Sequence, residues 1–222
     1  MRRSSVVRSG AVALALAALG AVAAEACSRV LWADNGQAVV TGRNMDWPED
    51  MLTDLWAFPR GLARQGASGD ANALSWTSKY GSVGAAVYDL AIADGMNEKG
   101  LVANLLWLSE SDYGRRDLNR PGLALSLWAQ YNLDNFATVA DAVADIESGR
   151  YQLVTAAMPG HATATVHLSL SDATGDSAII EIVEGGKARV HHDRRYLVMT
   201  NSPPFPEQLA NLKKYHVFGG AE

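Results

Sequence analysis

The sequence is short of three features that define common classes of protein. It holds a single cysteine, Cys27, so no disulfide can form within the chain. Only 19% of its residues are charged, the net charge is −5, and no run of lysine or arginine marks a nucleic-acid surface. It has neither a glycine-rich phosphate loop nor a dinucleotide-binding fingerprint. We therefore expect no nucleic-acid partner and no nucleotide cofactor.

Metal-binding patterns are also scarce. His191 and His192 are adjacent, but no acidic residue or histidine stands at ligand spacing beside them, so we interpret the pair as the end of a strand. The remaining histidines are scattered along the chain. The sequence predicts no metal ion and no other cofactor.

Long apolar runs are rare, and the clearest one lies near the N-terminus. A basic segment precedes an apolar stretch over residues 11–24, which is shorter than the roughly 20 residues of a transmembrane helix. Ala24-Glu25-Ala26 has the small-x-small pattern that signal peptidase cleaves. We expect residues 1–26 to be a signal peptide and the mature protein to be periplasmic or secreted, without stable membrane association after cleavage.

Two alternatives for this segment stay open. Cys27 could be the lipid-modified cysteine of a lipoprotein, although Ala24 stands where a leucine is usual. Arg2-Arg3 could belong to a twin-arginine signal, although the residues after the pair lack the usual pattern, so the export route is undecided. Cleavage after Ala26 would remove three arginines and one glutamate and change the net charge from −5 to −7.

The lone cysteine stands at the predicted cleavage junction. If cleavage follows Ala26, Cys27 carries both a thiol and a free α-amine, which are a nucleophile and a base in one residue. The alternative is a buried, inert cysteine, which is the default interpretation of a lone thiol. Its position at the junction favours catalysis, because an unpaired thiol is a liability in an oxidising compartment.

The body of the chain, residues 27–222, reads as one layered α+β domain without repeats or linkers. Two helices are predicted over 123–132 and 135–148, with Gly149 as the C-cap of the second. Surface loops are expected over 64–73 and 111–121. An initial β-hairpin turns at Asn35-Gly36. The strands are expected at 28–31, 37–41, 55–58, 74–79, 82–90, 91–93, 101–108, 164–170, 178–183, 187–191 and 196–200.

This hairpin would return Arg43 and Asp46 to a place beside Cys27. A cation near a thiol favours the thiolate, and a carboxylate could hold the α-amine by a charge-assisted hydrogen bond. A spacing of three residues does not place both side chains on one face of a strand, so we expect a turn or bulge at Asn44-Met45. The alternative is a solvent-exposed ion pair at a strand end.

Three further residues have two interpretations each. Trp47 and Trp107 could sandwich an aromatic or acyl group of a substrate, or they could be core residues like other tryptophans of the chain. Asn201, at a strand end before Ser-Pro-Pro, could be an Asx-turn residue or a catalytic amide, and the sequence alone favours the Asx turn.

The chain resembles the choloylglycine hydrolases, the bile salt hydrolases and penicillin V acylases within the N-terminal nucleophile hydrolases. The resemblance spans nearly all of residues 27–218. It is carried by Cys27 at the junction and by Gly42-Arg43-Asn44-Met45-Asp46-Trp47, Asn97-Glu98-Lys99-Gly100-Leu101, Asn104-Leu105-Leu106-Trp107 and Met199-Thr200-Asn201-Ser202-Pro203.

The resemblance implies a four-layer αββα sandwich that hydrolyses a linear non-peptide amide. Cys27 matches the family nucleophile, Arg43 and Asp46 match its motif partners, and Asn201 matches the side-chain oxyanion donor. The backbone N–H near Trp107 would be the second donor. Tryptophans at both pocket positions are similar to the Gram-negative penicillin V acylases, some of which cleave acyl-homoserine lactones, and bile salts fit less well.

The sequence also departs from the family. Members continue well beyond the length of this chain, and a second active-site arginine of the family has no counterpart here. We therefore expect a fragment or truncated reading frame, with an exposed sheet edge and an apolar face. Relatives commonly form tetramers, which makes a homotetramer one expected assembly. The alternative from a different class is a non-catalytic, lipid-anchored binding protein.

Overall fold

The computed structural model describes residues 27–66, 69, 71–155 and 163–218, so the predicted signal peptide lies outside the described residues. The strands are β1 (Ser28–Trp32), β2 (Val40–Asn44), β3 (Asp54–Phe58), β4 (Ala63–Gln65), β5 (Ser75–Thr77), β6 (Ser82–Val87), β7 (Ala91–Asn97), β8 (Val102–Trp107), β9 (Gly122–Ala124), β10 (Gln152–Val154), β11 (Val166–Ser171), β12 (Ser177–Val183), β13 (Lys187–His192) and β14 (Val198–Thr200). The helices are η1 (Leu125–Leu127), α2 (Trp128–Asn135), α3 (Val139–Glu147), α4 (Phe205–Leu212) and η2 (Lys213–Phe218).

The largest element is a seven-stranded antiparallel sheet in the order β13-β12-β11-β8-β7-β6-β3. Successive strands pair because tight turns join them, as between β7 and β8, where Gly100 takes a φ of +83° that glycine adopts without strain. Both faces of its central strands are buried, since β12 is buried along its whole length. This sheet is the scaffold on which the other layers pack.

A smaller sheet in the order β14-β1-β2 contains the start of the described chain. The predicted hairpin is confirmed, with Ser28 opposite Asn44, but the strand predicted over 37–41 is displaced, because β2 begins at Val40 and ends at Asn44. The reason is the Asn35 side chain, whose Oδ1 accepts the N–H groups of Gln37 and Ala38 at 2.9 Å and prolongs the turn.

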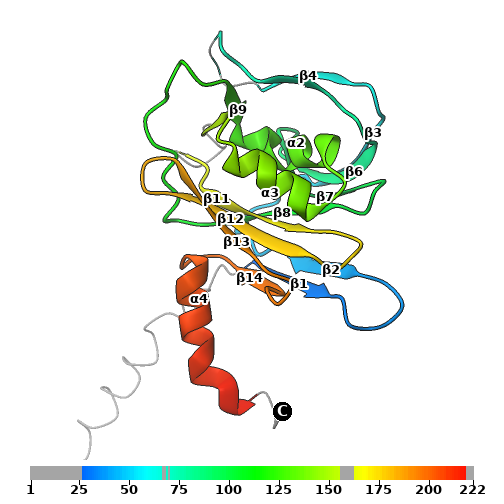
Figure 1. Cartoon of the computed structure of the whole chain (residues 1–222), viewed down its shortest axis with the longest axis vertical. Coiled ribbons are helices and arrows are strands. Elements are labelled where there is room, and N and C mark those ends of the chain that lie inside the picture. Colours follow the sequence, from blue (N-terminus) through cyan, green and yellow to red (C-terminus); the bar gives the residue numbers. More distant parts are fainter. Residues whose placement is uncertain (1–26, 67–68, 70, 156–162, 219–222) are drawn as a thin grey trace, which may run out of the picture.

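Helices α2 and α3 cover one face of the large sheet, and the small sheet lies on the other (Figure 1). Helix α3 begins at Thr138, whose hydroxyl accepts the Asp141 N–H, and Gly149 follows it with a φ of +64°, as a helix C-cap requires. The main core packs between these helices and the sheet, around the fully buried Trp128 and Tyr131. Helix, sheet and sheet confirm the predicted α+β sandwich.

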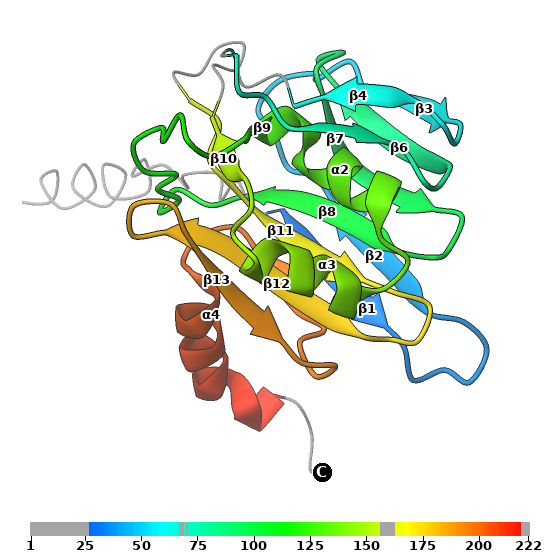
Figure 2. The same ribbon diagram turned by 45° about the horizontal axis from the view of Figure 1, so that its top comes forward.

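Helix α4 follows β14 and lies on the side of the molecule away from α2 and α3 (Figure 1), and Figure 2 shows the same helix after a 45° turn. Its first residue, Phe205, is 2% exposed and packs edge-on against Tyr196, with ring centroids 4.9 Å apart. The sequence patterns predicted no helix at this position. Its start depends on the tertiary contact of Phe205 as much as on the apolar spacing of its eight residues.

Two other predictions needed correction. The helix predicted over 123–132 was displaced, because residues 122–124 form β9, which pairs in parallel with β10 and delays the start of α2 to Trp128. The loop predicted over 64–73 was wrong at its beginning, since β4 pairs with β5. Tertiary pairing overrode local composition in both places.

The outer face of the small sheet is apolar and exposed. Along β1, outward residues alternate with buried ones, as a strand with one covered face requires. The exposed residues are Val30, Trp32, Val40 and Val198. Over the described ranges, the helices are too short or too polar to cross a bilayer.

Candidate active site

The candidate site forms where three strands of the small sheet end together. Ser28 lies opposite Asn44 on β2 and opposite Thr200 on β14. Extending both registers by one residue places Cys27 level with Met45 on one side and Asn201 on the other. Three segments thus meet at one corner of the molecule: the first described residue, the 43–47 segment, and the residue that follows β14.

Cys27 is buried, with 3% of its surface exposed, and its side chain lines a cavity. Its thiol lies 3.8 Å from the backbone carbonyl oxygen of Asp46, which is an acceptor for the S–H group. Asp46 itself is exposed, so its contact with Cys27 here is through the backbone. The strand ends at Asn44, which is the break in regular structure that the spacing of Arg43 and Asp46 predicts.

Arg43 forms an ion pair with Asp94 of β7, across the space between the two sheets. Asp94 is fixed in turn by Asn104 of β8, whose amide donates to its second oxygen at 2.8 Å. Arg43 thus pairs with Asp94 rather than with Asp46, and its side chain is 9% exposed. Sequence reasoning missed Asp94, although an acidic residue within the apolar strand 91–97 was a usable signal.

Arg29 adds a second positive charge to this region. It stands two residues after Cys27 on β1, so both side chains face the same side of the strand, and it is fully buried. Burial lowers the pKa of its guanidinium to about 10. Among the described residues its three side-chain nitrogens have no hydrogen-bond partner. Arg29 lies directly opposite Arg43 in the register of β1 and β2, so two cationic side chains share one face of the small sheet.

The cavity beside Cys27 has a volume of about 200 Å³. Arg43, Trp47 and Trp107 contribute to its wall, whereas Asp46 and Asn201 are absent from the described residues that line it. The rest of the wall is largely apolar, and includes Met45, Met51, Val87, Leu90, Leu105 and Val166. Such a lining accepts an acyl or aromatic group next to the thiol.

Trp47 and Trp107 pack directly against each other, with ring centroids 5.5 Å apart and an interplanar angle of 50°. This separation leaves no space for a third ring between them, so the predicted sandwich is replaced by a single aromatic wall. Trp47 donates from Nε1 to the hydroxyl of Tyr88 at 2.8 Å, and Tyr88 donates to Glu49. Burial, together with the Glu49 carboxylate, raises the pKa of Tyr88 and keeps it a donor.

Asn201 is 8% exposed and follows β14 directly. An Asx turn would need an N–H donor two or three residues later, but those residues are Pro203 and Pro204, which have none. The alternative interpretation of Asn201 therefore fails on chemical grounds. The loop around it is held from α4 by the side chain of Gln208, a residue that sequence reasoning did not single out.

The adjacent histidines turn to two different carboxylates. His191 lies 3.3 Å from Glu181, and His192 lies 2.8 Å from Asp176. The two imidazoles are therefore not aimed at a common point. In the part of the chain that the structure describes, no group of three or more potential side-chain ligands is placed to hold a metal ion.

The chain is similar to known proteins of one family. A family model for linear amide C–N hydrolases of the choloylglycine hydrolase family matches residues 27–219. A penicillin V acylase of Pectobacterium atrosepticum is 45% identical over 232 residues, which cover 99% of this chain and 61% of that protein. A bile salt hydrolase/transferase of Clostridium perfringens is 31% identical over 182 residues, covering 78% of this chain and 53% of that protein.

Solved structures give the same result. A penicillin V acylase from Agrobacterium tumefaciens superposes with a TM-score of 0.79 at 52% identity, covering 87% of this chain and 58% of that one. A conjugated bile acid hydrolase from Clostridium perfringens superposes with a TM-score of 0.72 at 26% identity, covering 86% and 58%. The chain spans between half and two thirds of the length of these relatives. It belongs to the choloylglycine hydrolase family of linear amide C–N hydrolases.

Proposed function

We propose that the chain is an amidase that cleaves linear non-peptide amides with Cys27 as its N-terminal nucleophile, in the manner of a penicillin V acylase. One observation carries the proposal: the Cys27 thiol lies in the wall of an apolar cavity, and the Arg43 guanidinium lies in the same wall. An inert cysteine in a packed core would have neither a cavity beside it nor a cation facing that cavity.

The geometry suggests the following reaction. The Cys27 thiolate attacks the amide carbonyl carbon and forms a tetrahedral intermediate with a negatively charged oxygen. The Asn201 amide and the backbone N–H near Trp107 donate to that oxygen. The C–N bond then breaks, and the departing amine takes a proton from the α-ammonium group of Cys27. Water, deprotonated by the same α-amine, releases the acyl group from the thioester.

This reaction requires a free α-amine, so the proposal includes export and removal of residues 1–26. Within the site, Arg43 shares the cavity wall with Cys27, and Asp94 holds Arg43 in place. Asp46 lies beside Cys27 through its backbone and is the acidic residue that we assign to the α-ammonium group once the chain is cleaved.

The cavity suggests the substrate class. Its apolar lining and its single indole wall suit a phenoxyacetyl group, whose ring can pack on Trp47 or Trp107. The same lining suits the acyl chain of an acyl-homoserine lactone, which we propose as a second substrate. A bile salt, whose steroid is rigid and larger than either group, fits a cavity of about 200 Å³ less well.

The proposal is tested by intact mass measurement of the exported protein before and after treatment with iodoacetamide. We expect a chain that begins at Cys27, takes up one alkyl group, and then fails to hydrolyse penicillin V. Prior incubation with penicillin V should slow the alkylation. A lipid adduct on Cys27 would instead support the anchored binding protein, and retention of Ala26 would remove the base and contradict the mechanism.

A second assay compares substrates. Hydrolysis of penicillin V, an acyl-homoserine lactone and a glycine-conjugated bile salt is measured under the same conditions. We expect the first to be fastest. A preference for the bile salt would place the chain among the bile salt hydrolases and overturn the substrate assignment.

A further inference from the structure

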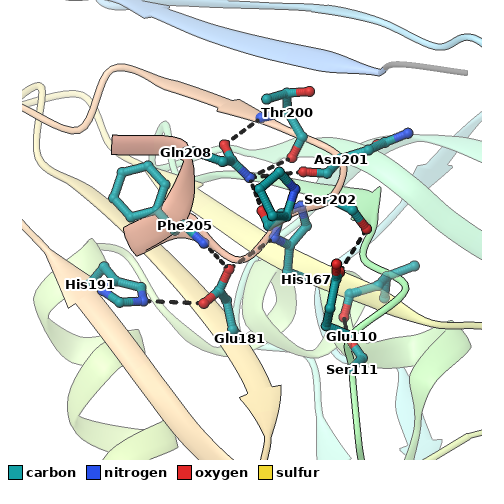
Figure 3. A network of polar contacts seen from close by, with 12 residues as sticks. Glu110, Ser111, His167, Glu181, His191, Thr200, Asn201, Ser202, Phe205 and Gln208 are labelled. Atoms are coloured by element: carbon teal, nitrogen blue, oxygen red, sulfur yellow. Dashed lines mark hydrogen bonds and ion pairs between the residues drawn. The ribbon is translucent and has the colours of Figure 1, made fainter. Parts of the chain in front are cut away.

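One amide side chain of α4 holds the loop that carries Asn201. Gln208 donates from Nε2 to the carbonyl oxygens of Asn201 at 2.8 Å and of Pro203 at 2.7 Å (Figure 3). The same nitrogen lies 3.3 Å from the Thr200 carbonyl oxygen, and Oε1 accepts the Thr200 N–H at 3.2 Å. A single side chain thus contacts four backbone groups between Thr200 and Pro203.

This loop cannot hold itself in the usual way. Pro203 and Pro204 have no N–H group, so the turn bonds that would normally close such a loop are unavailable. The carbonyl groups of Asn201 and Pro203 therefore take their donor from outside the loop, and Gln208 supplies it. The position of the Asn201 backbone depends on where Gln208 stands.

Helix α4 gives Gln208 a fixed place. Its first residue, Phe205, is buried against the ring of Tyr196 and lies 5.3 Å from that of His191. The Phe205 N–H donates to the buried carboxylate of Glu181 on β12 at 2.6 Å, which supplies the cap that Pro204 lacks. Gln208 is three residues further on, so it lies on the same side of the helix as Phe205 and faces the loop.

A second contact joins this loop to the other proposed oxyanion donor. The hydroxyl of Ser202 accepts the N–H of Ser109 at 3.0 Å. It also donates to Glu110 at 2.7 Å (Figure 3). Ser109 follows Trp107 by two residues, so the segment near the second donor is tied to the Asn201 loop. Gln208 on one side and Ser202 on the other therefore fix the loop with respect to β8.

We propose that Gln208 is a positioning residue for amide hydrolysis, which holds Asn201 where its side chain meets the developing oxyanion. This inference rests on the proposed function. Gln208 is not among the described residues that line the cavity beside Cys27, and it acts through the backbone of Asn201. Because an oxyanion donor stabilises the transition state more than bound substrate, a loosened loop lowers kcat and leaves KM nearly unchanged.

The test compares Gln208→Leu with Asn211→Leu. Asn211 lies one turn further along the same helix and is exposed, and none of the hydrogen bonds to the loop comes from it, so the control replaces an amide by leucine without removing those bonds. Rates of penicillin V hydrolysis are divided by the number of Cys27 thiols that penicillin V protects from alkylation, which removes any unfolded fraction. We expect Gln208→Leu to lower kcat about 10- to 100-fold, with KM within about twofold, and Asn211→Leu to match the wild type.

Two further measurements keep the inference falsifiable. Gln208→Glu has nearly the size of the native side chain but lacks the N–H donors, so it should lower kcat like Gln208→Leu even if the leucine variant folds poorly. Amide hydrogen exchange over residues 198–204 should be faster in both Gln208 variants and unchanged in Asn211→Leu.

The outcomes separate two failures. If the wild-type chain begins at a free Cys27 and hydrolyses none of the amides, the proposed function is wrong, and this inference is lost with it. If the wild type is active and the Gln208 variants keep its kcat, or raise KM alone, the proposed function stands and Gln208 is not a positioning residue. Faster exchange with unchanged kcat would assign Gln208 a structural role and overturn the inference.

Discussion

The two faces of strands β8, β11 and β12 differ sharply, although the same strands supply both. The face toward α2 and α3 is apolar, and its buried residues include Leu105, Leu168, Leu170, Ile180 and Ile182. The residues that alternate with them face the small sheet and are largely polar, although they are just as buried: Asn104, His167, Ser169, Ser177 and Glu181. Period-two alternation therefore separates two kinds of interior.

The two faces make different contributions to the protein. Apolar burial stabilises the fold by about 25 cal/mol per Å², without fixing directions. Buried polar groups are costly unless they are paired, and pairing fixes distances. On the polar face, Arg43 meets Asp94, Thr41 meets Ser171 at 2.9 Å, and Glu181 caps α4. The first face supplies stability, and the second aligns the elements that carry Cys27 and Asn201.

Removing the proposed nucleophile should abolish the proposed activity and leave the fold intact. We expect Cys27→Ala to lower penicillin V hydrolysis at least about 1000-fold, because no other residue can form the thioester. Its urea unfolding midpoint should change little, since few atoms are lost. Cys27→Ser, with a weaker nucleophile, is the matched control. Hydrolysis by Cys27→Ala at the wild-type rate would refute this assignment.

A cavity in the apolar face should lower the stability of the fold and leave the hydrolysis rate unchanged. Leu168 is fully buried, and Leu168→Ala should lower the free energy of unfolding by about 2 to 5 kcal/mol, as cavities in well-packed cores do. Urea denaturation measures this, and the hydrolysis rate per folded thiol should stay close to that of the wild type. Leu55→Ala is the control, because Leu55 is 80% exposed and should change stability by about 0.5 kcal/mol or less. Equal losses in both variants would contradict the comparison.

Acid should weaken the polar face selectively. Burial alone would raise the pKa of Glu181, but His167, His191 and the Phe205 N–H outweigh it and lower this pKa to about 2. The folded pKa lies below that of an unfolded glutamate, so the stabilisation is complete above about pH 4.5 and is lost as the pH falls toward 2. Stability measured against pH should decline over this window by about 2 kcal/mol more in the wild type than in Glu181→Gln. If the free energy of unfolding falls equally with acid in the wild type and in Glu181→Gln, Glu181 does not carry this stabilisation.

A smaller change tests whether the polar face positions the site. Asp94→Asn keeps the shape of the side chain but removes the charge that holds Arg43, and we expect about a tenfold loss in kcat/KM. Asp54→Asn, at an exposed position on edge strand β3, is the control and should have no effect. If the hydrolysis rate of Asp94→Asn falls while its urea unfolding midpoint does not, the ion pair acts on the site. A loss confined to stability would assign the ion pair to the fold.

Sequence patterns predicted the elements whose cause is local. Alternating residues and turn signals gave the hairpin, most strands of the large sheet, and the Gly149 cap of α3, because these depend on neighbours within a few residues. The same patterns placed the starts of β2 and α2 at the wrong residues. In the first case a side chain of Asn35 extends the turn, and in the second a parallel pairing with β10 captures residues 122–124. The spacing of apolar residues along the chain does not reveal such contacts.

Site residues divide in the same way. Cys27, Arg43, Trp47 and Trp107 were nominated from motifs, and the structure brings them to one cavity. Asp94 was missed because it lies 51 residues from Arg43, and an acidic residue in a strand has many possible partners. Gln208 was missed because it sits on a helix that the sequence analysis did not predict. Residue type identifies candidates for chemistry, whereas partners follow from the packing of layers.

By itself, the sequence determined the alternation that gives each central strand an apolar and a polar face, and the motif residues on and around them. The tertiary structure alone decided that the two tryptophans form one wall, that Arg43 turns to Asp94, and that the Asn201 loop rests on Gln208. The physical reason is that hydrophobic burial follows periodicity along the chain, while directional polar contacts exist only once distant segments have been brought within hydrogen-bonding distance.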